Sequence, residues 1–186
     1  MKSHWDSGIR VKELIEQHQP FIVVELGSGD CQNTANLMKL REHEGFWLIS
    51  VNDSWNKDQA DSIKSAGVTV IRGISYLELA KMDEVDFCLI DTDHNGWTLD
   101  QEMNQLRRCL SRDGIVCIHD TVTFAKNQGE MIDGYDKECG VPYPRDEIRN
   151  FPEGMIEVIR RNVKEGWFEV ERESDINHGA IALRRK

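Results

Sequence analysis

Short runs of apolar, β-branched residues alternate along the chain with longer segments in which apolar residues recur at helical spacing. The first such run, Phe21 to Leu26, stops at Gly27-Ser28-Gly29, and a segment with helical character from Asn33 to Glu44 follows it. This order recurs. The predicted strands are Phe21–Leu26, Phe46–Val51, Val68–Ile71, Val85–Ile90 and Ile115–Ile118, and the predicted helices are Ile9–His18, Asn33–Glu44, Lys57–Ala66, Tyr76–Met82 and Leu99–Leu110.

The predicted strands are apolar on both faces, which is typical of a parallel sheet covered by helices. Five strand and helix units in a row predict an α/β, Rossmann-like, doubly wound sheet with helices on both faces. A helix from about Glu153 to Glu165 then precedes two last strands, Trp167–Arg172 and Gly179–Arg184. The turn between these two strands is short, so they must run antiparallel and form a terminal hairpin. We therefore expect seven strands.

The regular alternation breaks between Thr121 and Phe151. This segment is rich in glycine and proline and shows little periodicity, so we interpret about residues 122–151 as a loop inserted into a single domain that spans residues 1–186. Loops of this length in compact domains often act as lids. Its Tyr135, Tyr143 and Arg145 are therefore candidate contacts to a substrate.

Composition narrows the range of partners. The chain of 186 residues carries 23 Lys and Arg against 33 Asp and Glu, a formal net charge of −10, and has no long basic cluster. We therefore expect no binding to nucleic acid or to an anionic membrane. No apolar run approaches the roughly 18 residues that a membrane span needs. The same charge balance favours a small substrate. Five cysteines without C-x-x-C spacing favour reduced thiols and a cytoplasmic protein. The sequence leaves the oligomeric state open.

The turn after the first predicted strand is a candidate ligand site. This turn, Glu25-Leu26-Gly27-Ser28-Gly29, connects a predicted parallel strand to the helix that follows it. In such sheets the backbone approaches a ligand at this place. The third glycine of a dinucleotide fingerprint is absent, because Cys31 stands nearest its place. Glu25 within an apolar strand supports a ligand, since a buried carboxylate needs hydrogen bonds. A tight turn without a ligand is the alternative.

Acidic and imidazole side chains follow two further strands. Asp91-Thr92-Asp93-His94 comes directly after one strand, and His119-Asp120-Thr121 ends another. In adjacent parallel strands these groups would meet at one edge of the sheet. Gathered carboxylates repel one another, and a divalent cation such as Mg²⁺ relieves that repulsion. Alternatively, Asp91 and Asp120 cap the following segments or bind amine groups of a cofactor.

These motifs together resemble the class I S-adenosylmethionine-dependent methyltransferases, and the resemblance covers nearly the whole chain. Glu25–Gly29 is similar to the first motif of that family, and Gly73–Ser75 to the segment that contacts adenine in its catechol O-methyltransferase branch. Ile90–His94 and His119-Asp120 resemble a small-domain group related to catechol O-methyltransferase and to the macrocin O-methyltransferase and cephalosporin hydroxylase families.

The resemblance implies roles for particular residues. The ribose ligand should follow the second strand, where Asn52 holds the usual acidic position and Asp53 comes next. Asp91 and Asp120 would be metal ligands, with His119 or Thr121 as a third contact. Asp93 or His94 would be the general base, and His94 stands where catechol methyltransferases keep a lysine. The implied cofactor contacts are Glu25, Gly27, Ser28, Gly29, Asn33, Asn52, Asp53, Ser75, Tyr76 and Asp91.

The expected activity is therefore transfer of a methyl group from S-adenosylmethionine to a hydroxyl oxygen of a small molecule, with Mg²⁺ assistance. Such a displacement requires alignment of donor and acceptor and removal of the hydroxyl proton. A nicotinamide-dependent oxidoreductase is disfavoured by the missing third glycine and the terminal hairpin. A non-catalytic S-adenosylmethionine-binding domain is a further alternative. Methylation of nucleic acid is weaker still, since no Asn-Pro-Pro-Tyr-type motif is present.

Four tryptophans fall close to these elements. Trp47 and Trp167 are expected in the core, because they stand on predicted strands. Trp55 is a candidate to cover adenine and Trp97 to line the acceptor site, and packing is the alternative for both.

Overall fold

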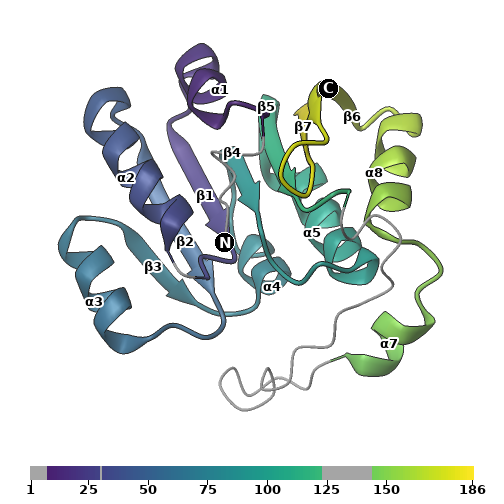
Figure 1. Ribbon diagram of the computed structural model, residues 1–186, viewed down its shortest axis with the longest axis horizontal. Helices are drawn as coiled ribbons and strands as arrows, with labels where there is room; N and C mark the ends of the chain where they lie inside the picture. The colour runs from purple at the N-terminus through teal and green to yellow at the C-terminus, as the bar shows by residue number, and fades with distance from the viewer. Residues whose placement is uncertain (1–7, 30, 123–143) are drawn as a thin grey trace.

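Figure 1 shows the computed structural model, which describes residues 8–29, 31–122 and 144–186. Its seven strands form one sheet in the order β3-β2-β1-β4-β5-β7-β6. The strands are β1 (Ile22–Leu26), β2 (Trp47–Asn52), β3 (Thr69–Arg72), β4 (Val85–Ile90), β5 (Leu110–His119), β6 (Phe168–Ser174) and β7 (Ala180–Arg185). The helices are α1 (Val11–His18), α2 (Gln32–Glu44), α3 (Lys57–Ser65), α4 (Ser75–Leu79), α5 (Gly96–Cys109), α7 (Arg145–Asn150) and α8 (Met155–Lys164).

The direction of the strands agrees with the expectation. β1 to β5 pair in parallel, whereas β7 runs antiparallel to both β5 and β6. The predicted α/β sheet with an antiparallel terminal hairpin is therefore confirmed. No helix among residues 8–29, 31–122 and 144–186 is long and apolar enough to cross a membrane.

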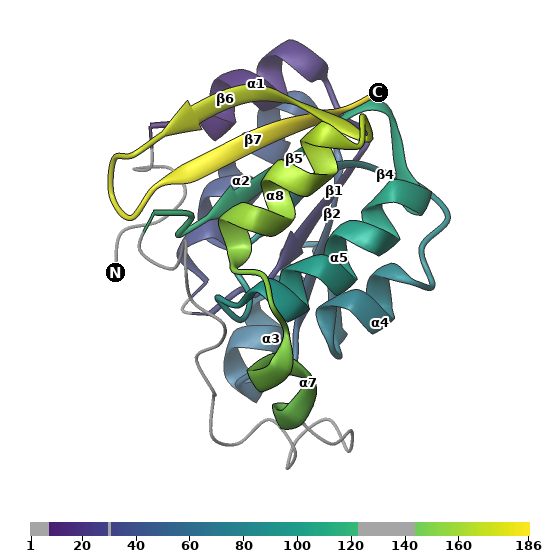
Figure 2. The same ribbon diagram turned by 90° about the vertical axis from the view of Figure 1, so that its right-hand side faces the viewer.

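Helices cover both faces of the sheet, as Figure 2 shows with α4, α5 and α8 toward the viewer and α1, α2 and α3 behind. Successive residues of a strand point to opposite faces. On β4, Phe87 and Leu89 pack with α1, α2 and α3, whereas Cys88 and Ile90 pack with α4, α5 and α8. This double burial explains why the parallel strands are apolar throughout.

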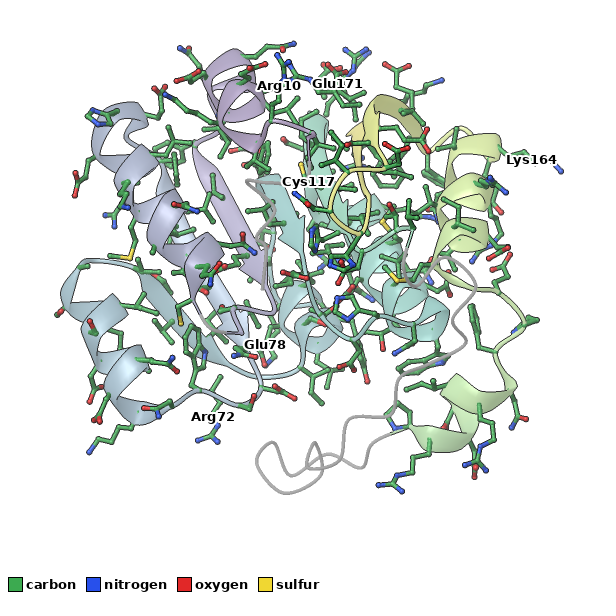
Figure 3. The ribbon with its side chains drawn as sticks, viewed as in Figure 1. Arg10, Arg72, Glu78, Cys117, Lys164 and Glu171 are labelled. Carbon is green, nitrogen blue, oxygen red and sulfur yellow. The ribbon has the colours of Figure 1, made fainter. Side chains whose placement is uncertain are left out.

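The register of the strands brings three chain segments to one edge. Leu26 at the end of β1 pairs with Ile90 at the end of β4, and Ile90 pairs with Ile118 of β5. Gly27, Asp91 and His119 therefore follow at nearly the same level. In Figure 3 this carboxyl edge lies low in the molecule, at the end marked by Arg72 and Glu78, whereas Arg10 and Glu171 mark the opposite edge.

The expected inserted loop contains a helix in its described part. Residues 123–143 lie outside the described residues, but Arg145–Asn150 form α7, whose Ile148 is buried. The segment that follows α7 lies directly against the start of α5, because a Cβ atom on Gly96 would come within 1.9 Å of the Glu153 carbonyl oxygen. A glycine is thus required at Gly96 for this close approach.

The expectation that Trp47 and Trp167 lie in the core is wrong. Their side chains are 48% and 46% exposed. Trp47 begins β2 at the edge opposite the carboxyl ends and donates its indole N–H to Thr69 Oγ1 at 2.8 Å. Trp167 precedes the edge strand β6, and the Arg107 guanidinium lies 5.2 Å from its ring centre. Strand propensity alone does not bury a residue that stands at a strand's open end.

Candidate functional site

The glycine turn after β1 is held against the end of β4. Gly27 has a φ of +81°, and a Cβ atom there would meet the carbonyl oxygen of Asp91 at 2.1 Å. The Asp91 N–H donates to the Leu26 carbonyl at 2.9 Å, which keeps the two strand ends together. Gly29 also has a positive φ, and a Cβ atom there would meet no atom within 4 Å. The turn therefore presents bare backbone to open space at the carboxyl edge.

Glu25 is fully buried beneath this turn. Its Oε2 accepts hydrogen bonds from Thr34 Oγ1 and Ser50 Oγ, both at 2.6 Å, and the Ser28 hydroxyl contacts Ser50. Burial raises the pKa of the Glu25 carboxyl group, while the hydroxyl hydrogen bonds act in the opposite direction. The turn is thus tied to β2 and α2 through side-chain hydrogen bonds.

The tips of β4 and β5 bring two carboxylates and two imidazoles together. His94 Nε2 lies 2.9 Å from Asp120 Oδ2 and 3.4 Å from Asp91 Oδ1. His119 Nδ1 lies 3.2 Å from Asp120 Oδ1 and 3.5 Å from Asp91 Oδ1. Asn33 on α2 donates its amide to Asp91 Oδ2 at 3.2 Å. The predicted convergence of Asp91 and Asp120 is present in the structure.

A potential cation site lies within this group. One ligand atom each from Asp91, His94 and Asp120 can be chosen so that all three lie within 4.8 Å of one another. The imidazole in this set is His94, expected from the sequence as a base, rather than His119, expected as a ligand. The alternative third contact, Thr121, is buried, and its backbone N–H donates to the Gly179 carbonyl at 3.3 Å.

The two candidate bases have different protonation states. Burial on its own would lower the pKa of His94, but hydrogen bonds to Asp120 and Asp91 outweigh burial and raise that pKa to about 9. The ring is therefore a cation at neutral pH and offsets the charge of the two carboxylates. Burial raises the pKa of Asp93 to about 6, with a contribution from the charge of Asp53, while His94 acts in the opposite direction. Asp93 is thus mostly ionised at neutral pH.

The expected ribose and adenine contacts stand at the ends of β2 and β3. Asn52 and Asp53 are both partly buried, and the Asp53 carbonyl accepts from Arg72 Nε at 3.3 Å. Ser75 opens α4, where its hydroxyl is buried and donates to Glu102 of α5. The Tyr76 ring packs edge-on against Trp97, with the ring centres 5.5 Å apart.

Comparisons with known proteins give structural matches alone: no family model and no curated protein matches the chain. SAH-bound methyltransferase PaMTH1 from Podospora anserina matches with a TM-score of 0.68 at 12% identity, covering 100% of this chain and 80% of that one. A candidate caffeoyl-CoA O-methyltransferase from Staphylococcus aureus gives 0.65 at 12% identity over 95% and 81% of the two chains. A candidate O-methyltransferase from Klebsiella pneumoniae gives 0.64 at 12% identity over 100% and 84%. The chain has the class I methyltransferase fold.

The tryptophans near this edge and the described part of the insertion have the following surroundings. Trp55 is buried and donates to the Ile71 carbonyl at 3.0 Å, so it packs against β3. Trp97 packs with Ile74 and Ile148 beside Tyr76. Arg145 begins α7. Tyr135 and Tyr143 lie outside the described residues.

Sequence reasoning missed Glu102. It is fully buried on α5 and accepts hydrogen bonds from the hydroxyls of both Ser75 and Thr92. Helical periodicity could have located it, because Leu99, Met103 and Leu106 place position 102 on the buried face of the helix. A carboxyl group on an otherwise apolar helix face is the signal.

Proposed function

We propose that this chain is an S-adenosylmethionine-dependent methyltransferase that methylates a hydroxyl oxygen of a small molecule with the help of a divalent cation such as Mg²⁺. The single observation that carries the proposal is the meeting of Asp91, His94 and Asp120 at the sheet edge, next to the bare backbone of the Gly27 turn. A divalent cation would relieve the repulsion between the carboxylates gathered at this edge.

The chain offers a suitable seat for the cofactor. Gly29 faces open space, Asp91 lies against Gly27, and Asn33 donates its amide to the Asp91 carboxylate. The ends of β2 and α4 supply Asn52 or Asp53 for ribose hydroxyls and Ser75 with Tyr76 for the adenine side. S-adenosylmethionine, when bound, would supply the methyl group that is transferred. The SAH bound to a methyltransferase of the same fold supports this assignment.

The donor set also fits a hard divalent cation. Asp91 and Asp120 provide carboxylate oxygens, the ligands that Mg²⁺ prefers, and the ring of His94 or His119, in its neutral form, would complete the set. A bound cation would lower the pKa of an acceptor hydroxyl. The cation would also offset the negative charge of the two carboxylates, as the His94 imidazolium does in the structure.

Among the chain's own residues, Asp93 is the better base. His94, with a pKa of about 9, holds its proton at neutral pH, so it cannot accept another. Asp93, with a pKa of about 6, is ionised at neutral pH and basic enough to take the hydroxyl proton. These pKa values favour Asp93 over His94, two residues that the sequence pattern left as equal candidates.

The setting we propose is the cytoplasm, and the partner is a small methyl acceptor. Cys88, Cys109 and Cys117 are buried free thiols, which supports a reducing compartment. The net charge of −10 supports the exclusion of nucleic acid as an acceptor.

Isothermal titration with S-adenosylhomocysteine tests the cofactor half of the proposal. We expect binding at micromolar concentrations, and absence of binding at high micromolar concentrations would refute it. Titration with Mn²⁺ tests the cation half, using Asp120→Asn as the altered site and Asp61→Asn, an exposed carboxylate on α3, as the matched control. Cofactor binding with no cation binding at Asp91 and Asp120 would point to a non-catalytic binding domain.

A further inference from the structure

Glu102 is a polar exception on a buried helix face. Its neighbours on that face, Leu99, Met103 and Leu106, belong to the apolar cluster between α5 and the sheet, and Glu102 is as fully buried as they are. A carboxyl group in such surroundings is unfavourable unless hydrogen bonds compensate it. An apolar side chain of similar size would fill the position without that cost, so packing alone does not account for a glutamate.

The hydrogen bonds of Glu102 converge on one atom. Oε1 accepts from the hydroxyl of Ser75 and, at 2.8 Å, from that of Thr92. Among the described residues no hydrogen-bond partner is found for Oε2. Two hydroxyls from separate elements are thus the partners that hold it.

These two hydroxyls belong to different halves of the site. Ser75 is the first residue of α4, on the adenine side of the proposed cofactor seat. Thr92 lies in the segment after β4, between Asp91 and Asp93, on the side of the proposed cation site. One buried oxygen therefore links two chain segments, because Ser75 and Thr92 are 17 residues apart in the sequence.

We propose, on the basis of the function proposed above, that Glu102 is a positioning residue that couples the cofactor seat to the cation site. By holding Ser75 and Thr92 on one oxygen, it sets the two segments relative to each other. Binding of one ligand then improves the placement of the groups that bind the other. Such coupling is reciprocal by thermodynamic necessity.

The protonation state of Glu102 agrees with this role. Burial raises its pKa to about 8, the hydroxyls of Ser75 and Thr92 lower it, the charge of Asp93 raises it and that of His94 lowers it. Cys88 of β4 is the other titratable group that interacts with it. At neutral pH the side chain is mostly a neutral acid, so glutamine is a close substitute that can still accept both hydroxyl hydrogen bonds.

The test measures affinity for S-adenosylhomocysteine with and without saturating Mn²⁺, and affinity for Mn²⁺ with and without S-adenosylhomocysteine. In the wild type we expect each ligand to improve the other's affinity by at least about fivefold. Glu102→Leu should bring this factor close to one and weaken S-adenosylhomocysteine binding by about tenfold. In Glu102→Gln the coupling factor and the affinity for S-adenosylhomocysteine should both lie within about twofold of the wild-type values, which a loss of packing would not explain.

Thr92→Val provides a second test that leaves the helix untouched. It removes one hydroxyl from the link, so the coupling factor should fall as in Glu102→Leu, while S-adenosylhomocysteine binding without Mn²⁺ changes less. The inference is overturned if the wild type binds both ligands independently, or if Glu102→Leu and Thr92→Val keep the wild-type coupling. A wild type that binds no S-adenosylhomocysteine would overturn the proposed function itself and the inference with it.

Discussion

Replacement of Glu102 by glutamine should make the stability of the protein less dependent on pH. The pKa of Glu102 is about 8 in the folded protein, compared with an ordinary value of 4.5. Between these values an unfolded chain has released the proton that the folded chain keeps, so rising pH opposes folding. The contribution is complete below pH 4.5 and is lost as the pH rises through about 8.

The size of the effect follows from that interval. Each pH unit between 4.5 and about 8 should lower the free energy of unfolding by up to about 1.4 kcal/mol, or about 5 kcal/mol in all. This figure is an upper limit, because local opening around Glu102 would relieve part of the loss. The glutamine variant lacks this ionisation, so its stability relative to the wild type should improve steadily from pH 5 to pH 8.

Urea unfolding followed by circular dichroism at pH 5, 6, 7 and 8 measures the difference. The amide group of glutamine has its own cost of burial, but that cost does not change with pH. Glu42→Gln, at an exposed position on α2, controls for the loss of one carboxyl group. A free-energy difference between Glu102→Gln and wild type that is the same at pH 5 and pH 8 would show that Glu102 is not held in its neutral form.

Further outcomes concern the glycine turn and the site. Gly27→Ala should abolish binding of S-adenosylhomocysteine and lower the melting temperature, because the new Cβ atom would meet the Asp91 carbonyl oxygen at 2.1 Å. Gly45→Ala is the control: no atom lies within 4 Å of the new Cβ atom, so the free energy of unfolding should fall by only about 1 kcal/mol. Once an acceptor is identified, EDTA or Asp91→Asn should abolish turnover measured by methyl transfer from labelled cofactor, and full activity in EDTA would exclude a cation. Turnover should fall as the pH drops below about 6, where Asp93 takes up a proton. Asp93→Asn should lower turnover by about 100-fold or more and remove that pH dependence. A variant that keeps the wild-type pH profile would exclude Asp93 as the base.

The sequence by itself determined the sheet and the place of the site. Apolar runs and glycine turns are local features that can be recognised in the sequence. The carboxyl ends of parallel strands lie at one edge of the sheet, so the proximity of Asp91 and Asp120 could be predicted. The register of β1, β4 and β5 then places Gly27 at the same level.

Only the tertiary structure decided how the side chains divide their roles. The sequence suggested His94 as a base and His119 as a metal ligand, but their distances to the two carboxylates depend on the turn at Asp120, where φ is +57°. The link from Glu102 to Ser75 and Thr92 joins three elements and leaves no local pattern that names its partners. Side-chain orientation and burial depend on which elements pack together in space, whereas the periodicity of a chain records only that a face is buried.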